Sequence, residues 1–236
     1  MATFAVTLGA EQSAGSGSLT IPMPAGTLTR KLLLIYSGHR NSNGATMSDV
    51  PDGTYTEIAF TQPGTNKNSY LWGKIGTASE ASQTVTWSGS SARVGWSLAI
   101  SSDTGWPSIG QIVAAYSGVT SGSNLNLRFA AHAISTTGNL ILSLATRATT
   151  ACTATSITPT AGWTAAGFVN QGSGNSLGAG QILLTPATSD IAENSVTITG
   201  NTDSGTTRGI TIELRPACQV LPAKPYIGKR LNLQRM

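Results

Sequence analysis

Cysteine and charge are both scarce in this sequence. Cys152 and Cys218 are the only cysteines among 236 residues, too few to frame a secreted fold held together by disulfides. Charged residues make up 10% of the chain and aromatic residues 6%, and no apolar run is long enough for a membrane-spanning helix. The start of the chain also lacks a basic leader followed by an apolar run. We therefore expect no disulfide framework, no secretory leader and no membrane span.

The two cysteines leave three states open. They can remain unpaired, form a bridge within the chain, or form a bridge between subunits. Cys218 follows the last predicted strand, so its position allows an intersubunit disulfide as well as an unpaired thiol.

The few charges are unevenly placed. The chain has 14 Lys and Arg against 10 Asp and Glu, a formal net charge of +4. Four bases and no acid lie in residues 216–236, so residues 1–215 are formally neutral. A protein that reads nucleic-acid phosphates normally has a basic stripe on its folded body. We expect no specific nucleic-acid partner, and from the basic end only weak, salt-sensitive contact with an anionic surface.

Short β-strand patterns are abundant. Apolar residues make up 39% of the chain and alternate with small polar residues in blocks separated by Gly, Pro, Asn, Asp or Ser. Many short strands must pair in two layers to cover one another's apolar faces, so the sequence predicts an all-β antiparallel sandwich over residues 1–215. The predicted strands include "KLLLIYS", "SYLWGKIG", "VGWSLAIS", "GQIVAAYSG", "LRFAAHAIS", "NLILSLATR" and "RGITIEL".

Several of these patterns occur twice in the same order, which indicates two related halves. The halves cover about residues 28–100 and 138–215, and residues 101–137 join them and add strands. The offset grows from 108 to 114, as loop insertions would produce, because loops absorb added residues at little thermodynamic cost. Chance similarity among Thr/Gly/Ser-rich strands is the alternative. The matched segments are 32–34 with 140–142, 53–56 with 161–164, 85–89 with 196–200, and 95–100 with 209–214.

Motifs for catalysis or metal binding are missing. The only histidines, His39 and His132, lie in no catalytic pattern, and no nucleophile motif accompanies them. We expect His39 in a loop and His132 in a strand, as a surface or partly buried imidazole. Asp49, Asp52 and Asp203 lie in turn sequences without the closing Glu of an EF-hand, so we expect turn-forming roles. The sequence thus predicts no enzyme activity, no metal and no cofactor.

Tryptophans are the candidates for glycan contact, because flat apolar rings suit sugar faces. Trp87 and Trp96 lie in predicted strands and are expected in the core. Trp106 and Trp163 lie near turns and are the better candidates for exposure, although a Trp that anchors a loop onto a sandwich is the alternative.

The segments "KLLLIYSG", "PDGTYTEI", "YLWGKIGTASEASQTVTWSG" and "IVAAYSGV" together resemble a family of tailed-bacteriophage virion proteins. Lys74 and Glu80 fall at the Lys and Glu positions of that pattern. The resemblance implies a jelly-roll β-sandwich that serves as a head decoration, neck, collar or tail-associated component without catalysis. It also implies location in the virion, after assembly in the host cytoplasm.

The last residues predict an extended basic arm, residues 216–236. Pro222 and Pro225 disfavour helix, and the apolar residues beyond them alternate, which suits strand addition to a neighbouring sheet. A frayed, solvated terminus is the alternative. The predicted docking residues are Tyr226, Ile227, Lys229, Arg230, Leu231, Leu233 and Arg235.

Two functions from different classes follow from these observations. The first is a structural component of a phage particle, capsid decoration or neck and collar, that docks through its arm onto other virion proteins. We expect such a protein to self-associate as a trimer or ring, because weakly charged surfaces suit close symmetric packing. The second is a carbohydrate- or receptor-binding module, lectin-like and associated with a tail fibre.

Overall fold

Alternating apolar and small polar residues form strands throughout the part of the chain that a computed structural model describes. No α-helix occurs in the described residues, and none of them form a helix of the length and hydropathy needed to cross a membrane. The described residues are 3–15, 17–39, 45–48, 55–61, 68–78, 80–87, 92–106, 108–109, 113–120, 126–129, 131–135, 139–148, 153–171, 176–185, 187, 189–200 and 207–216.

Seventeen strands are present in these residues. In chain order they are β1 (Phe4–Leu8), β2 (Gln12–Ala14), β3 (Leu19–Ile21), β4 (Leu32–His39), β5 (Ala45–Ser48), β6 (Thr56–Thr61), β7 (Asn68–Ile75), β8 (Gln83–Trp87), β9 (Arg93–Ser102), β10 (Val113–Thr120), β11 (Leu127–Phe129), β12 (Leu140–Ala148), β13 (Ser156–Thr158), β14 (Thr164–Asn170), β15 (Ser176–Leu183), β16 (Asn194–Thr199) and β17 (Thr207–Leu214).

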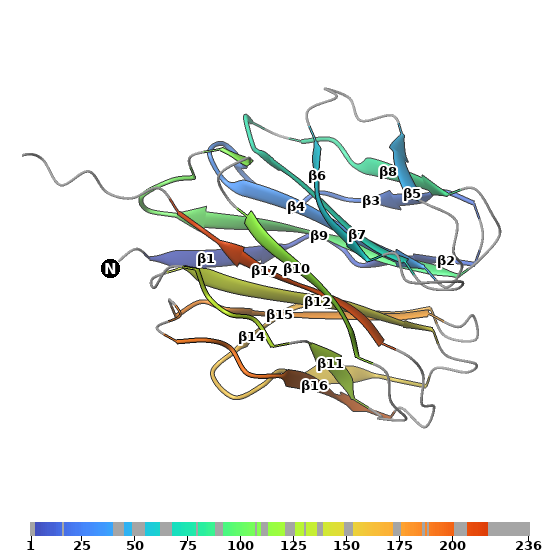
Figure 1. The fold of residues 1–236 in the computed structure, drawn as a ribbon. Helices are drawn as coiled ribbons and strands as arrows, with labels where there is room; N and C mark the ends of the chain where they lie inside the picture. The colour runs from blue at the N-terminus through green and yellow to red at the C-terminus, as the bar shows by residue number, and fades with distance from the viewer. Residues whose placement is uncertain are drawn as a thin grey trace, which may run out of the picture.

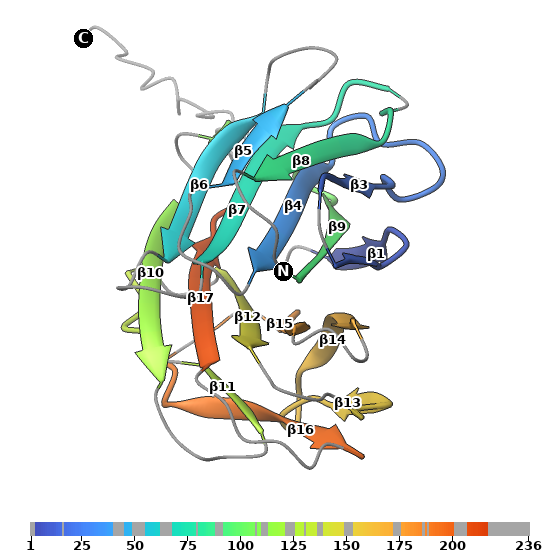
Figure 2. The same cartoon turned by 90° about the vertical axis from the view of Figure 1, so that its right-hand side faces the viewer.

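The strands form four sheets, stacked as layers with the two large sheets in the middle (Figure 1). One large sheet has the order β1-β9-β4-β7-β6, with β2 also paired to β9, and the other has the order β10-β17-β12-β15-β14. The three-stranded sheets β3-β8-β5 and β11-β16-β13 lie on the outer sides, as the rotated view also shows (Figure 2). The pairings between the named strands are antiparallel.

The two large sheets repeat one another in strand order and register. β4 lies between β9 and β7, and β12 lies between β17 and β15. Leu33 of β4 is opposite Ala99 of β9, and Ile141 of β12 is opposite Glu213 of β17. These are the residues that the sequence comparison matched, so the pairing has the same register in both sheets.

The edges of the sheets follow the same correspondence. β6 and β14 each form one edge, and each has an irregularity in its pairing, between Glu57 and Ala59 in β6 and between Ala165 and Phe168 in β14. The outer sheets correspond as well, with β8 between β3 and β5 and β16 between β11 and β13.

Three apolar clusters lie between the four layers. Alternation along each central strand sends side chains to both faces, so both faces of the large sheets must be covered. The central cluster, between the large sheets, includes Leu32, Leu34, Tyr36, Trp96, Leu98, Leu140, Leu142, Leu144, Ile210 and Ile212. The outer clusters include Leu19, Ile21, Ile35, Tyr70, Trp72 and Val85 on one side, and Leu127, Phe129, Ala145, Leu177, Ala179, Val196 and Ile198 on the other.

Trp96 fixes how the two large sheets meet. Its side chain is fully buried, and its Nε1–H donates a hydrogen bond to the Ala166 carbonyl at 2.6 Å. Gly167 and Gly178 make room for the ring, because a Cβ at Gly167 would lie 2.2 Å from the indole nitrogen. The N-terminal large sheet thus supplies a large aromatic side chain, and the C-terminal one supplies the space for it.

Tyr36 makes a second polar contact across this interface. Its hydroxyl donates to Ser69 Oγ at 2.8 Å and shares a hydrogen bond of 2.7 Å with Thr146 Oγ1. Burial raises the pKa of the Tyr36 hydroxyl well above its ordinary value, so the hydroxyl stays protonated inside the core.

We predict that Gly178→Val destabilises the protein by about 1–3 kcal/mol, the usual cost of overpacking a filled core. A Cβ at this position would lie 2.8 Å from Cζ3 of Trp96 and 2.9 Å from Cγ2 of Val94. Chemical denaturation measures the loss, and Gly26→Ala is the control because a Cβ there meets no atom within 4 Å. Gly26 has a φ of +94°, so the control carries backbone strain but no collision. A smaller loss for Gly178→Val than for the control would contradict the packing described here.

The all-β, antiparallel class predicted from the sequence is confirmed. One boundary needs correction. Residues 101–137 do more than join two halves, because β10 pairs with β17 and β11 pairs with β16 inside the C-terminal sheets. The predicted strand "LRFAAHAIS" is also shorter than expected, since β11 ends at Phe129 and His132 forms only an isolated bridge with Ile191.

Candidate functional site

A buried carboxylate stands out near the end of the last described strand. Glu213 lies on β17 between β10 and β12, and its side chain is fully buried. It shares a face of the strand with Thr211, whereas Ile212 and Leu214 point into the central cluster. Burying a charged carboxylate is costly unless the group is paired and hydrogen-bonded. The surroundings of Glu213 therefore decide what this position does.

Hydrogen bonds from one preceding segment satisfy much of this carboxylate. The Ser135 N–H donates to Glu213 Oε2 at 3.0 Å, and the Ser135 hydroxyl lies 2.8 Å from both carboxylate oxygens. The amide of Asn139, itself buried, donates to Oε1. A carboxylate that accepts several such hydrogen bonds is stabilised in its charged form.

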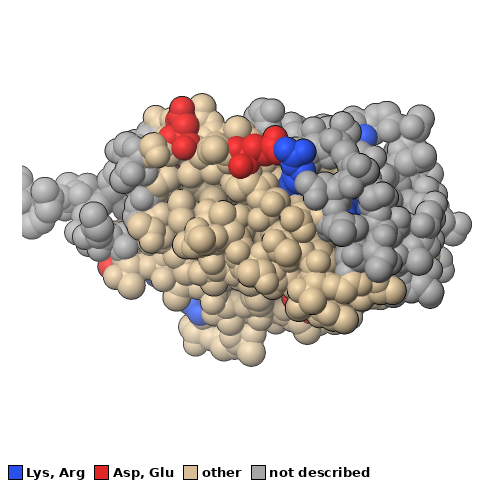
Figure 3. All heavy atoms as spheres, turned by 90° about the horizontal axis from the view of Figure 1, so that it is seen from below, with Lys and Arg blue, Asp and Glu red and all other residues tan. Residues whose placement is uncertain are grey.

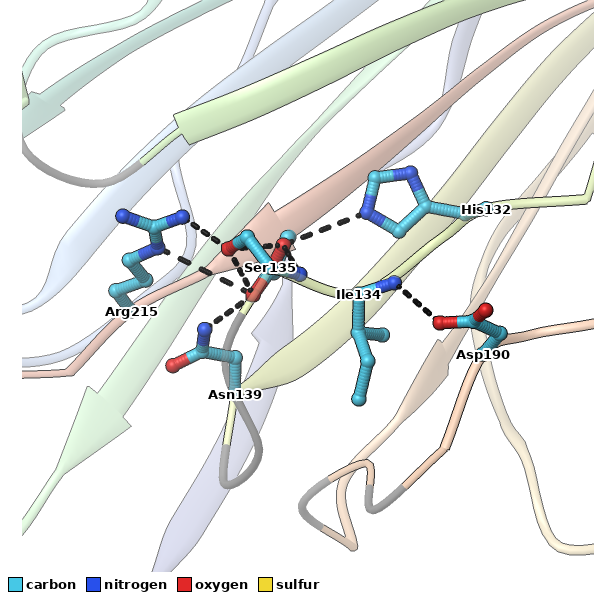
Figure 4. A network of polar contacts seen from close by, with 7 residues as sticks. His132, Ile134, Ser135, Asn139, Asp190 and Arg215 are labelled. Carbon is cyan, nitrogen blue, oxygen red and sulfur yellow. Dashed lines mark hydrogen bonds and ion pairs between the residues drawn. The ribbon is translucent and has the colours of Figure 1, made fainter.

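Two basic side chains face the same carboxylate from opposite sides (Figure 4). Nε2 of His132 lies 3.5 Å from Oε2, and Nε of Arg215 lies 4.0 Å from Oε1. Arg215 also donates to the Ser135 hydroxyl. Next to this group, the Ile134 N–H donates to Asp190 Oδ1 at 3.0 Å. We call Glu213, His132, Ser135, Asn139 and Arg215 the Glu213 cluster.

The geometry of the Glu213 cluster is not that of a nucleophilic triad. In a triad the serine hydroxyl donates to the histidine, and the carboxylate orients the histidine from its other side. Here Ser135 donates its hydroxyl to the carboxylate, and His132 approaches that carboxylate separately. The arrangement instead ties residues 132–139 to the end of β17, and it includes Arg215, which lies directly before the C-terminal segment.

The N-terminal sheet solves the same position without charge. Ala99 occupies the place of Glu213 in the register of the large sheets. It is packed in a small apolar cluster with Leu28 and Leu33, and Met23 lies against that cluster. The fold therefore does not require a carboxylate here, and the polar version is a property of the C-terminal half alone.

A second buried ion pair lies at the positions that carry the family resemblance. Lys74 Nζ lies 3.0 Å from Glu80 Oε2, and both side chains are nearly inaccessible. The same ammonium lies 5.0 Å from the centre of the Tyr55 ring. The structure thus brings together three residues from the resembling segments. Their mutual contacts hold the β7–β8 connection against the residue that precedes β6, which is a structural role.

The two predicted glycan-contact residues differ in position. Trp106 is only 7% exposed, and its Nε1–H donates to the Ile100 carbonyl at 2.8 Å. Its expected exposure is therefore corrected: the chain turns back after Ser102, and Gly105 has a φ of 76° that folds the ring onto Phe4. Trp163 is half-buried, directly after a turn closed by its N–H and the Thr160 carbonyl.

The expected strand position of His132 at the surface is also corrected, since the side chain is 6% exposed. The predicted docking residues Tyr226, Ile227, Lys229, Arg230, Leu231, Leu233 and Arg235 lie outside the described residues, as do Cys152, Cys218, Asp49, Asp52 and Asp203. The His39 side chain is likewise outside them. Across the described ranges, no group of three or more His, Cys, Asp or Glu could hold a metal ion.

The described outer surface carries few charges. On the face seen from below, uncharged residues cover most of the described area, and the charged ones gather along one side (Figure 3). The exposed face of the outer sheet is lined by hydroxyls, since Ser156 is opposite Thr199 and Thr158 is opposite Thr197. Arg128 and Glu193 form an ion pair at its margin.

Comparisons with known proteins add no relative: neither a family model, nor a curated protein, nor a solved structure matches the chain.

Sequence reasoning missed the Glu213 cluster. The one available signal was Glu213 itself, a lone acid inside the apolar alternation "GITIEL" and matched to Ala99 in the repeat. Ser135 lies 78 positions away from it, and no local pattern connects the two residues.

Proposed function

We propose that this protein is a non-enzymatic structural component of a phage particle, a capsid decoration or neck and collar protein. In this proposal the body consists of two related jelly-roll units, and residues 217–236 dock it onto neighbouring subunits. Self-association as a trimer or ring belongs to the same proposal.

Two related units are supported by the strand pairings. The order, the central register and the edge irregularities recur between β1–β9 and β10–β17. The packing of the large sheets is also reciprocal: β4 packs on β12, β9 packs on β15, and β7 packs on β17. Such reciprocity is what two copies related by a two-fold axis produce.

The observation that carries the functional proposal is the Glu213 cluster at the root of the C-terminal segment. A docking segment transmits force and orientation only if the body fixes the point from which it leaves. Arg215, the penultimate described residue, is held by Glu213 and Ser135, and both are tied to the sheet. The scarcity of charge on the described surface supports the same function, because weakly charged faces pack closely in symmetric assemblies.

A carbohydrate- or receptor-binding module remains the alternative, and one residue still favours it. Trp163 is half-buried beside the hydroxyl-lined outer sheet, whereas buried Trp106 no longer contributes to a platform. A glycan array with the intact protein tests it, with Trp163→Ala as the matched variant. Binding that Trp163→Ala abolishes would favour this alternative over the structural function.

Deleting residues 219–236 is expected to abolish incorporation into particles while leaving the body folded. The described core lies within residues 3–216, so thermal melting should be nearly unchanged. The measurement is the copy number of the protein in virions produced with the variant as its sole source.

Point variants separate docking from simple loss of chain. Leu231→Asn combined with Leu233→Asn should reduce incorporation strongly, because strand addition needs apolar residues at alternate positions. Lys224→Gln, outside the predicted docking set, is the matched control and should incorporate normally. Normal copy number for the truncated protein would remove the arm from the proposal.

A further inference from the structure

We propose that His132 and Glu213 form a pH-sensitive latch that holds the root of the C-terminal segment through Arg215. The inference rests on the proposed function, in which that segment docks the protein, and it concerns how the docking is regulated.

His132 is placed to change charge without moving. Its backbone is fixed by reciprocal hydrogen bonds with Ile191, of 2.8 Å and 2.9 Å. Its side chain is 6% exposed, and Nε2 points at Glu213 Oε2 from 3.5 Å (Figure 4). Among the described residues this buried nitrogen has no hydrogen-bond partner. An imidazole aimed at a carboxylate without a completed hydrogen bond is a group whose protonation changes the interaction strongly.

Arg215 competes with His132 for the same carboxylate. With a neutral imidazole, the Arg215 guanidinium balances Glu213, and the three groups have no net charge. With a protonated imidazole they carry one net positive charge, and the two cations repel each other across one anion. Coulomb interactions are stronger in a partly dry interior than in water, so this repulsion is felt at the observed separations of 3.5 Å and 4.0 Å.

Exposure decides which cation leaves. The Arg215 side chain is 40% exposed, whereas that of His132 is 6% exposed and fixed by its backbone. Arg215 can therefore move into water at little cost, and His132 cannot. The other acids nearby are engaged, since Asp190 accepts the Ile134 N–H and Glu193 pairs with Arg128. Protonation of His132 should thus release Arg215, and with it the start of the C-terminal segment.

The N-terminal half supports a specific role for this arrangement. The matching position is filled by Ala99, Leu28 and Leu33, which cannot titrate, and the chain there continues into the body instead of leaving it. The titratable version occurs only where a terminal segment begins.

A spin label on Cys218 tests the latch in the full-length chain, with Cys152→Ser to leave one thiol. Between roughly pH 8 and roughly pH 5, where histidine changes charge, we expect label mobility to rise on the order of twofold on acidification. His132→Gln should remove this step, and Arg215→Gln should give the mobile state at every pH. His39→Gln, a change in the other histidine of the chain, is the matched control and should retain the step.

A second measurement covers variants that fold poorly. In the unmodified protein, NMR of the Arg215 Nε–H and of the His132 ring should show both groups changing together across the same pH range. A mobility step of equal size in folded His132→Gln, or no step in the wild type, would overturn the latch. Neither result depends on particle incorporation, so failure of the docking arm and failure of the latch are distinguishable.

Discussion

Replacing Trp96 by Ala is expected to cost about 3–5 kcal/mol of the free energy of unfolding, the largest single loss in the central core. The indole is fully buried between the two large sheets. Its removal leaves a cavity bounded by Gly167 and Gly178, which have no side chains to move into the space. It also leaves the Ala166 carbonyl without the donor that lies 2.6 Å away.

Equilibrium denaturation in urea measures this loss, with Trp163→Ala as the matched control. Trp163 has the same chemistry but is only half-buried, so its truncation should cost about 1 kcal/mol or less. If the two substitutions cost the same, the two large sheets do not depend on Trp96 for their packing.

Replacing Glu213 by Ala is the second large effect, with an expected loss of about 3–5 kcal/mol. Ala fits this position in principle, since Ala99 fills it in the other half. The loss arises because Ser135 and Asn139 lose their acceptor and the Arg215 guanidinium loses its counter-charge, while all three remain in place. The substitution thus breaks a satisfied polar network without replacing it by an apolar one.

Two further variants assign the cause of that loss. Glu213→Gln keeps an acceptor for Ser135 and should recover part of the stability, whereas Glu57→Ala, on an exposed side chain, should change it by about 0.5 kcal/mol or less. A loss for Glu213→Ala no larger than that for Glu57→Ala would show that the cluster contributes nothing to the fold.

The fold class could be predicted from the sequence because its determinants are local. Apolar alternation in segments such as "KLLLIYS" and "NLILSLATR" specifies strands, and the repeated order of those segments anticipated which strands share a register. The segment from 101 to 137 was harder to interpret, because its strands pair with β16 and β17, which lie far along the chain.

The site could not be predicted for the opposite reason. Glu213 is compatible with a strand at any exposed position, and its burial depends on Ser135 and Asn139, which approach it only in the folded chain. Trp106 was misplaced on similar grounds. A turn sequence indicates exposure on average, but here the turn directs the ring back onto Ile100 and Phe4.

The account rests on the protein being a built-in part of a particle, and particle composition tests that most directly. Quantitative mass spectrometry of gradient-purified virions should find this polypeptide at a fixed copy number, in a constant ratio to the other virion proteins from one preparation to the next. Its absence from intact particles, while it is abundant in the lysate that produced them, would contradict the account.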